Sequence, residues 1–428
     1  MPTGRETTHG GARFGRTPQS RVATLTFPGA PHVIELHDSD MLCRTLETVM
    51  PAWTGTMAHG PVEGATPVTT IRQHEDGSFS FRSRWGQRPL TDLGQAGATC
   101  GAVADITQSY LDARPGIFGL HCGAVRIGGH LIAFTGTYRA GKTTLVTRLG
   151  IEPDFELFCD DVLPIGTDGK AVALGIQPRL RLPLPDTVAP GFGDYVSRSL
   201  TVQDHRYGYV SIPTQAPRGT RAPLAALVVL SRRDCGPARF HRMEPAEAAA
   251  YLIRQNIADP GEAEAHYDRV AAMAEGLTCL HLVYSDLEEA VGLVRAAFEA
   301  PAIPATDLDI GAALPPEDPD GEGEPADLDG LFVRAEDVSD RQIGTDTFLW
   351  QMDRRNFFSL NPVGGGVWAL FENPVTGWEI VATLREVFTD VAPDAIGADV
   401  SALLGQMRQA GLVILHDAGP ELDDTEQN

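Results

Sequence analysis

The segment Gly136–Thr143 has the residue types and the spacing of a phosphate-binding loop. Its sequence, GTYRAGKT, matches the pattern G-x-x-x-x-G-K-[ST] at every position. In such a loop the glycines let backbone amides turn toward phosphate, the lysine adds a positive charge, and the hydroxyl binds Mg²⁺. We therefore expect Lys142 to contact phosphates and Thr143 to contact the metal ion. The residues expected to bind the nucleotide are Gly136, Thr137, Tyr138, Arg139, Ala140, Gly141, Lys142, Thr143 and Thr144.

A pair of carboxylates follows the next strand-like run. Phe155–Cys159 is apolar at most positions and ends in Asp160 and Asp161, 18 residues after Lys142. Two adjacent carboxylates at a strand end suit a Mg²⁺ ligand and a base for an incoming hydroxyl. A polar turn after a strand would look the same in isolation, so the nearby phosphate loop is what favours the functional interpretation.

Three arginines and one histidine are weaker candidates. Arg179 and Arg181 lie in the run PRLRLP, and Arg206 lies in the run DHRY, which we interpret as a substrate loop. Each guanidinium could bind a phosphate group of the nucleotide or the substrate, but for Arg179 and Arg181 an ordinary solvated strand face fits equally well. His121 precedes the strand that leads toward the phosphate loop, and a lone histidine is more often structural.

The elements around these residues alternate between strands and helices, which indicates an α/β domain over residues 116–300. His121–Ile127 and His130–Thr135 read as strands joined at Gly128-Gly129, and a helix begins at Lys142. Further strands are expected at Leu224–Ser231 and Leu277–Tyr284, and further helices at Pro245–Ile257, Glu262–Glu275 and Leu287–Phe298.

The remainder of the chain suggests two flanking domains. Residues 21–115 read as a small α+β region, with strands at Val22–Phe27, His32–Leu36 and Ser78–Arg84 and helices at Met41–Met50 and Ala98–Ala113. Residues 331–416 read as a winged-helix-like module, with strands at Thr347–Gln351, Asn356–Leu360 and Leu412–Leu415 and helices at Val363–Glu372, Thr376–Phe388 and Ile396–Gln409.

The charge distribution marks the segments between these domains. Residues 301–330 hold nine acidic residues and no Lys or Arg, so we expect an unstructured acidic linker there. Residues 1–20 read as a disordered tail and residues 417–428 as an acidic tail.

Composition excludes several classes of protein. The 428-residue chain has a net charge of −23, which argues against a nucleic-acid partner held by a broad basic surface. It has no apolar run long enough to span a membrane and no apolar secretory segment at its start, so we expect a cytoplasmic protein without a membrane partner. The six cysteines are scattered, which predicts neither a disulfide framework nor a zinc site.

His121, the hairpin into the phosphate loop and Asp160-Asp161 together resemble the catalytic domain of HPr serine kinases and their distant relatives, over about Gly116–Phe298. The resemblance implies a core related to phosphoenolpyruvate carboxykinase that uses ATP and Mg²⁺. It implies that Asp160 acts as the base, that Asp161 contacts Mg²⁺, and that His121 and Lys142 complete the catalytic set. Thr143-Thr144 replaces the family's Ser-Glu, and no Glu-Arg-Gly signature is legible over Gly175–Pro183, so we do not expect HPr itself to be the substrate.

The C-terminal module resembles PqqD, a peptide-chaperone family that includes the leader-binding elements (RiPP recognition elements) of peptide-tailoring enzymes. The residues that carry this resemblance are Phe358–Asn361, Gly365–Phe371, Trp378–Ile380 and Val400–Leu415. The resemblance implies that a leader peptide adds as a strand at the edge of the small sheet, against the last helix. A winged-helix module used for dimerisation or for DNA binding is the structural alternative.

These features together predict a kinase that transfers phosphate from ATP to a Ser or Thr hydroxyl of a ribosomally made precursor peptide. The module would hold the leader, and the linker would let the rest of the peptide reach the site. Two alternatives stay open: an ATP-sensing adaptor that delivers the peptide to another tailoring enzyme, and a kinase of a small metabolite. The sequence fixes neither the peptide nor a homo-oligomeric state, although HPr-kinase relatives often form oligomers.

Overall fold

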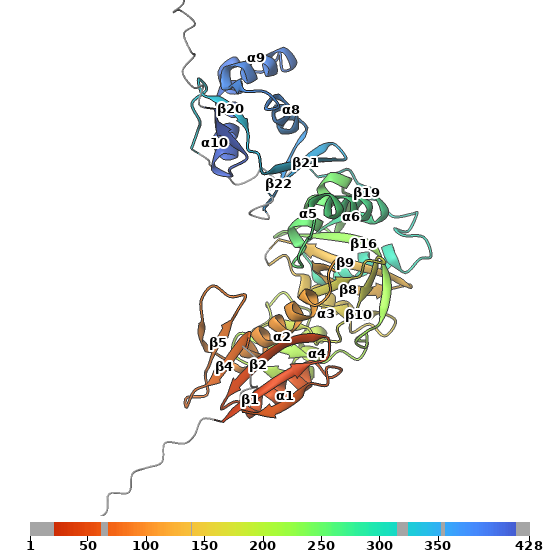
Figure 1. Cartoon of the computed structure of the whole chain (residues 1–428). Coiled ribbons are helices and arrows are strands. Elements are labelled where there is room, and N and C mark those ends of the chain that lie inside the picture. Colours follow the sequence, from red (N-terminus) through yellow and green to blue (C-terminus); the bar gives the residue numbers. More distant parts are fainter. Residues whose placement is uncertain (1–20, 61–66, 138, 315–323, 352–355, 417–428) are drawn as a thin grey trace, which may run out of the picture. The chain divides into compact units, whose positions relative to one another are not determined.

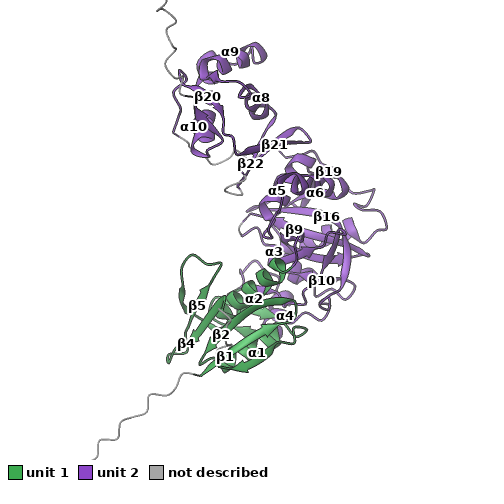
Figure 2. Cartoon of the chain, viewed as in Figure 1, with its two compact units in different colours: residues 1–113, 180–183, 200–210 green, residues 114–179, 184–199, 211–428 purple. Residues whose placement is uncertain are grey.

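The computed structural model describes residues 21–60, 67–137, 139–314, 324–351 and 356–416 (Figure 1). The expected tails and Tyr138 lie outside these residues. The described chain forms two compact units (Figure 2): unit 1 comprises residues 21–113 together with 180–183 and 200–210, and unit 2 comprises the rest. These limits differ from the expected domain ranges, because two segments from within 116–300 join the N-terminal unit and the C-terminal module shares unit 2.

Unit 1 is an α+β structure built on a six-stranded sheet with the order β3-β1-β2-β4-β5-β6. Its strands are β1 (Val22–Phe27), β2 (Ala30–His37), β3 (Thr56–His59), β4 (Thr69–Gln73), β5 (Phe79–Ser83) and β6 (Leu90–Leu93). Its helices are α1 (Asp40–Val49) and α2 (Gln95–Asp112). Helix α1 buries Leu42, Leu46 and Val49, whose spacing places them on one face. A small sheet β13-β15-β14 consists of β13 (Arg179–Arg181), β14 (Leu200–Gln203) and β15 (Tyr207–Val210).

Unit 2 contains a mixed ten-stranded sheet with helices packed against it. Its strands are β7 (Phe118–His121), β8 (Gly123–Ile127), β9 (His130–Gly136), β10 (Glu156–Cys159), β11 (Val162–Ile165), β12 (Lys170–Val172), β16 (Arg221–Arg232), β17 (Arg239–Arg242), β18 (Thr278–Tyr284) and β19 (Ile310–Gly311). Its helices are α3 (Lys142–Leu149), α4 (Pro190–Ser199), α5 (Pro245–Gln255), α6 (Ala263–Gly276) and α7 (Leu287–Phe298).

The centre of this sheet is parallel. Strand β16 pairs with β9 on one side and with β18 on the other, both in parallel register. Every residue of β9 from Leu131 to Gly136 is buried, as expected for a strand covered on both faces. The chain turns into the glycine-rich loop at the carboxyl end of β9, opposite Leu230 of β16.

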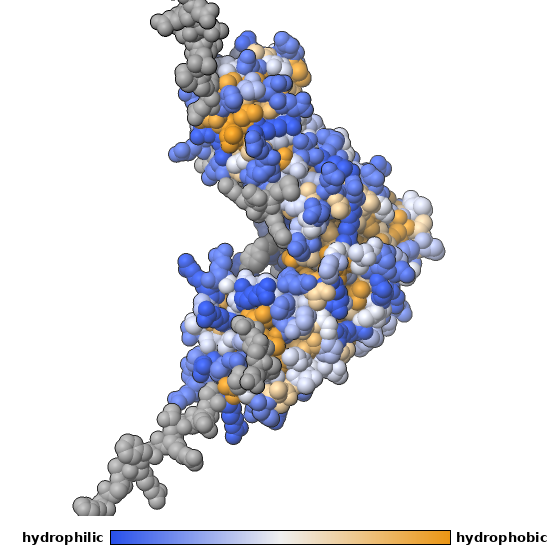
Figure 3. Space-filling view, viewed as in Figure 1, coloured by the Kyte–Doolittle hydropathy of each residue, from blue (hydrophilic) through white to orange (hydrophobic). Residues whose placement is uncertain are grey.

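The C-terminal part of unit 2 has two three-stranded sheets, ordered β21-β22-β23 and β24-β20-β25, and three helices. The elements are β20 (Leu331–Arg334), β21 (Val338–Ile343), β22 (Asp346–Gln351), β23 (Asn356–Leu360), α8 (Pro362–Leu370), β24 (Val375–Thr376), α9 (Gly377–Val387), α10 (Pro393–Gln409) and β25 (Val413–Leu415). Ile414 and Leu415 of β25 are about half exposed, and Figure 3 shows hydrophobic residues at the surface of this part, near β20 and α10.

Strand β22 is buried on both of its faces. Phe348 and Trp350 point into the core that includes Tyr267 of α6, whereas Leu349 joins the separate core of α8, α9 and α10. Successive strand residues alternate between faces, so β22 packs the C-terminal module onto the body that carries the ten-stranded sheet.

The segment between body and module is partly ordered where an unstructured linker over 301–330 was expected. Strand β19 pairs with β17, and Ala326 is buried in the core of the C-terminal helices. Ala326 also exchanges two hydrogen bonds with Ser401: its N–H donates to the serine carbonyl at 2.9 Å, and its carbonyl accepts from the serine hydroxyl at 2.6 Å. The remaining residues, 315–323, lie outside the described part of the chain.

The helices and most strands expected from the sequence are confirmed, with end points shifted by a few residues. One expected strand, His121–Ile127, is two strands, because Cys122 separates β7 from β8 and each half pairs with a different neighbour. No helix in the described residues is long and apolar enough to cross a membrane.

The aromatic contact between module and body gives a stability prediction. Trp350→Ala removes a ring that stacks on Phe357 at 5.2 Å and meets the Tyr267 ring edge-on at 6.5 Å. We expect a loss of about 3–5 kcal/mol in the free energy of unfolding of this part, measured by urea denaturation followed by fluorescence. Trp378→Ala, which removes a 55 % exposed tryptophan, is the matched control and should cost about 1 kcal/mol or less. Equal losses for the two variants would contradict the shared core.

Candidate functional site

The glycine-rich loop is held in a conformation that only glycine adopts easily at two positions. Gly136 and Gly141 have φ angles of 147° and 92°. A Cβ atom at Gly136 would also lie 2.8 Å from the carbonyl oxygen of Leu230, and one at Gly141 would collide with the Tyr284 hydroxyl. The sequence pattern therefore has a steric cause here: the backbone passes too close to β16 and β18 for any larger residue.

Tyr284, at the end of β18, supports this loop and was not predicted from the sequence. Its hydroxyl donates a hydrogen bond to the carbonyl oxygen of Ala140 at 2.8 Å. Burial raises the pKa of Tyr284 to about 12, so the hydroxyl stays protonated and remains a donor at physiological pH.

Lys142 begins helix α3 and is half-buried. Its ammonium group donates to the carbonyl oxygen of Gly136 at 3.2 Å, so the side chain folds back over the loop. Burial lowers the pKa of Lys142, while the charges of Asp161 and Asp160 oppose that shift. A desolvated cation at a helix N-terminus is suited to bind phosphate oxygens. Of the other expected loop residues, Ala140 is buried, Thr143 and Thr144 are half-buried, and Thr137 and Arg139 are exposed.

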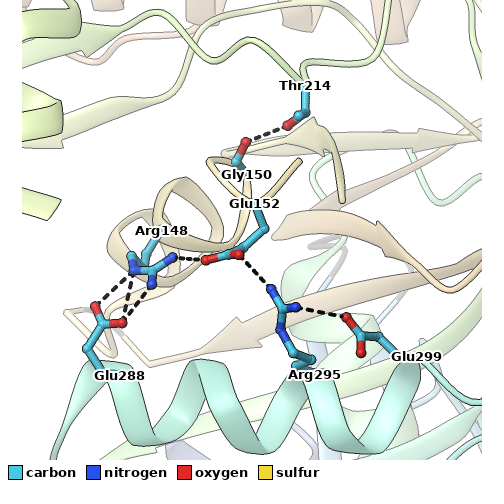
Figure 4. Close-up of polar contacts among 7 residues, drawn as sticks. All are labelled: Arg148, Gly150, Glu152, Thr214, Glu288, Arg295 and Glu299. Carbon is cyan, nitrogen blue, oxygen red and sulfur yellow. Dashed lines mark hydrogen bonds and ion pairs between the residues drawn. The ribbon is translucent and has the colours of Figure 1, made fainter. Parts of the chain in front are cut away.

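A network of charged residues anchors α3 to α7 (Figure 4). The Arg148 guanidinium on α3 donates to Glu288 of α7 at 2.7 and 2.8 Å and to Glu152 at 2.5 Å. Arg295 of α7 closes the network by donating to Glu152 at 2.6 Å. Because Arg148 and Glu152 at the centre of the network are largely shielded from water, their ion pairs help to fix the orientation of the helix that carries Lys142 and Thr143.

Asp160 and Asp161 form the two-residue connection between β10 and β11, and their environments differ. One Asp160 oxygen accepts a hydrogen bond from the Arg179 N–H at 2.9 Å, while the other is buried with no hydrogen-bond partner among the described residues. Burial raises the pKa of Asp160 to about 6, and the Asp161 charge adds to that shift. A carboxylate with a pKa near neutrality and an unused oxygen is suited to accept a proton.

Asp161 is exposed to solvent over 66 % of its side chain and lies 3.2 Å from Nε2 of His121. Partial desolvation by the surrounding protein opposes the shift, but the hydrogen bond from His121 and the charges of His121, Arg179 and Lys142 hold the pKa of Asp161 below its usual range. Asp161 therefore stays ionised at all physiological pH values, as a cation ligand requires.

The donor set fits Mg²⁺ in one specific way. No group of three or more His, Cys, Asp and Glu side chains in the described chain could hold a metal ion. The Thr143 hydroxyl and one carboxylate would supply few ligands by themselves. Mg²⁺ is usually bound by one or two carboxylates together with substrate phosphates, and the Thr143 hydroxyl with one carboxylate is consistent with that kind of site.

His121 is the last residue of β7 and pairs with Val162 of β11. This register places its ring beside Asp161. A short segment after α5, also missed from the sequence, pairs with the other edge of β7: Asn256 accepts from the Gly119 N–H at 3.0 Å, and the Ile257 N–H donates to the Gly119 carbonyl at 2.9 Å. Strand β7 is therefore fixed on both edges.

The three expected arginines lie in different parts of the structure. Arg179 belongs to unit 2 and reaches Asp160 through its backbone N–H. Arg181 and Arg206 belong to unit 1, where the carbonyl of Arg206 accepts from the Leu182 N–H at 2.8 Å. The expected substrate loop around Arg206 is closed by Asp204, whose carboxylate accepts from the N–H groups of Arg206, Tyr207 and Gly97. Arg179 therefore lies next to the aspartate pair, and the expected contact of these arginines with phosphate groups stays a prediction.

Residues 347–413 match the family model for coenzyme PQQ synthesis protein D (PqqD). The chain therefore carries a PqqD domain at its C-terminus, as predicted from the sequence. A search of curated proteins found no match.

Two solved structures are similar to parts of this chain. One is TbiB1 in complex with the TbiA(beta) leader peptide, at 21% identity over 19% of this chain and 93% of that one, with a TM-score of 0.18. The other is the HPr(Ser) kinase/phosphatase from Coxiella burnetii, at 12% identity over 41% of this chain and 93% of that one, with a TM-score of 0.21.

The opposite pKa shifts of the two aspartates predict opposite effects on stability. Asp160 has a folded-state pKa of about 6 against an ordinary value of 3.8, so its contribution to stability is greatest below pH 4 and is lost as pH rises through 6. Asp160→Asn should raise the free energy of unfolding by up to about 3 kcal/mol at pH 8 and change it little at pH 4.

Asp161→Asn is the matched control, since the lowered pKa of Asp161 stabilises the folded state above the unfolded-state pKa and that stabilisation is lost on acidification. We expect this variant to be less stable than the wild type at pH 8 and to approach it at low pH. Urea titrations of all three proteins at both pH values would check the pair. Parallel pH profiles for the two variants would contradict the assigned environments.

Proposed function

We propose that this protein is an ATP-dependent kinase that phosphorylates a Ser or Thr hydroxyl of a ribosomally made precursor peptide, with the leader held by the C-terminal PqqD domain. The observation that carries the proposal is the pairing of two features in one chain. A lysine-containing glycine loop stands beside two aspartates with opposite pKa shifts, and the same chain carries a PqqD domain.

In this proposal the body has an HPr-kinase-like P-loop core and the module is winged-helix-like. The ATP phosphates bind over Gly136–Thr143, with Lys142 on the β- and γ-phosphates. Thr143 and Asp161 hold Mg²⁺, which neutralises phosphate charge when it is bound. His121 orients Asp161, and the Arg179 N–H orients Asp160.

The reaction itself needs one proton acceptor and good positioning. The acceptor oxygen of the peptide forms a bond to the γ-phosphorus, the bond from that phosphorus to the β–γ bridging oxygen breaks, and the hydroxyl proton passes to Asp160. The products are phosphopeptide and ADP. Most of the rate enhancement comes from alignment and charge stabilisation, as in other phosphoryl transfers.

The leader site in this proposal comprises the free edge of β23 and helix α10. Strand β23 pairs with β22 and with no other described strand. An added peptide strand would extend that sheet through backbone hydrogen bonds, and side-chain pockets would select its sequence.

The proposed reaction is tested with a short peptide encoded next to the gene, incubated with the protein, ATP and Mg²⁺. Intact-mass spectrometry should show the gain of one phosphate. Asp160→Asn should lower the rate about 10²–10⁴-fold, because the proton acceptor is lost, while ATP affinity changes little. Lys142→Ala should abolish both product and ATP binding, and Asp154→Asn, an exposed aspartate before β10, is the matched control.

Two results would contradict the proposal. Full activity of Asp160→Asn would remove the assigned base. Leader binding without any mass change would favour an ATP-sensing adaptor over a kinase.

A further inference from the structure

A cavity of about 420 Å³ lies where β23 faces the C-terminal end of α5. Its lining residues are Ile253, Arg254, Asn256, Ala258, Pro260, Asn356, Phe357 and Phe358. Side chains of successive strand residues point to opposite faces. A cavity that touches three consecutive residues of β23 therefore borders the backbone edge of that strand as well as one face.

The two walls of this groove are held together by a buried aromatic cluster. Phe357 stacks on Trp350 at 5.2 Å and lies 5.3 Å from the ring of His266 and 6.0 Å from that of Tyr267. The first two residues belong to the module and the last two to α6 of the body. A peptide entering the groove would find both walls already in place, which lowers the entropy cost of binding.

The chemistry of the walls points to one kind of occupant. Ile253, Ala258 and Pro260 form an apolar surface on the body side. Arg254 is the one charged residue in the lining; it is exposed, and its guanidinium lies 4.7 Å from the ring centre of Tyr251. The nearby Asp259 carboxylate is turned into its own loop, where it accepts from the Gly261 N–H at 3.1 Å.

The net charge of the whole chain sets Arg254 apart from its surroundings. The whole chain carries −23, so its general field repels an acidic peptide. A single exposed arginine at the mouth of an apolar groove is then a specific attachment point for a carboxylate, and it sets the register of the peptide.

We propose that the groove between β23 and Ile253–Pro260 is a composite peptide site, in which the kinase-like body supplies the second wall. The occupant is an extended peptide that pairs with the β23 edge, places an apolar side chain in the cavity and places an acidic side chain on Arg254. This inference rests on the proposed leader recognition and deepens it. The PqqD domain by itself provides the edge, whereas sequence selection comes in part from the body.

The probe is a phage-displayed library of random 12-residue peptides, selected on the full chain without ATP. We expect enriched peptides to carry Asp or Glu at a fixed distance from an apolar residue. Synthesised peptides should bind Arg254→Glu about tenfold more weakly than wild type. Arg242→Glu, a charge reversal at an exposed arginine at the end of β17, is the matched control and should bind within about twofold of wild type.

Two further measurements separate pairing from charge. Changing the acidic residue of the peptide to lysine should restore binding to Arg254→Glu and weaken binding to wild type. N-methylation at alternate peptide residues should abolish binding, and N-methylation at the intervening residues should not, because a strand presents every second N–H to its neighbour. If Arg254→Glu melts at a lower temperature than wild type, Arg254→Gln replaces it.

The outcomes distinguish this inference from the proposed kinase. Peptides that bind wild type, Arg254→Glu and Arg254→Gln equally would overturn the composite groove and leave leader recognition standing. Enrichment of no peptide would overturn both the groove and leader recognition. Binding with the expected charge dependence, but without phosphate transfer from ATP, would support the groove and count against the kinase.

Discussion

The site depends on two changes of strand partner that face each other in the same sheet. On one chain segment, β7 ends and β8 begins on either side of Cys122, and the two strands pair with different neighbours. On the other, β10 gives way to β11 at Asp160 and Asp161. The strand register fixes the positions of both changes. His121 pairs with Val162 on one side, and Ala124 pairs with Cys159 on the other. Between these pairs, the Cys122 N–H donates a hydrogen bond to the Asp161 carbonyl at 3.0 Å. A slip of one residue in either pairing would turn these side chains to the opposite face.

This arrangement explains how adjacent carboxylates come to have different environments. Asp160 turns inward, where burial raises its pKa, and Asp161 turns outward toward His121 and solvent. The two aspartates lie in the bend between β10 and β11 and point in different directions. This one connection therefore offers a proton acceptor with a pKa near neutrality and a carboxylate that stays ionised. The buried carboxylate costs folding free energy at neutral pH, which the surrounding apolar core of the sheet offsets.

The sequence predicted the parts of the site that are contiguous in the chain, and it missed those that depend on distant pairing. Gly136–Thr143 and Asp160-Asp161 each carry their chemistry within a few residues. Tyr284 is 144 residues from its partner Ala140 in the sequence, and Asn256 is 137 residues from its partner Gly119. Neither Tyr284 nor Asn256 lies in a recognisable motif. The transfer of residues 180–183 and 200–210 to unit 1 has the same origin, because nothing local in a three- or four-residue strand reveals its partner.

The fold class was predicted more fully than its connections. The helices and strands of the PqqD domain carry clear local periodicity, but the burial of β22 on both faces does not show in a run such as DTFLWQ. That burial bears on which segment could let the C-terminal module move relative to the body in the proposed function. From the sequence we expected the flexibility to lie in an acidic linker over 301–330. In the structure, the aromatic core around Trp350 attaches the sheet with the proposed leader-binding edge to the body.

Asn256 lies in the wall of the proposed peptide groove and also binds Gly119 of β7, the strand that ends at His121. In the proposed function, a leader held in the groove would therefore have a fixed position relative to the aspartate pair. The reach of the rest of the peptide is then set by the number of residues between its leader and its acceptor hydroxyl. Effective concentration falls steeply once a connecting segment is too short to span the two sites. Under the proposed function, selection of one hydroxyl among several would therefore depend on peptide length, measured from the groove, as well as on contacts at the site itself.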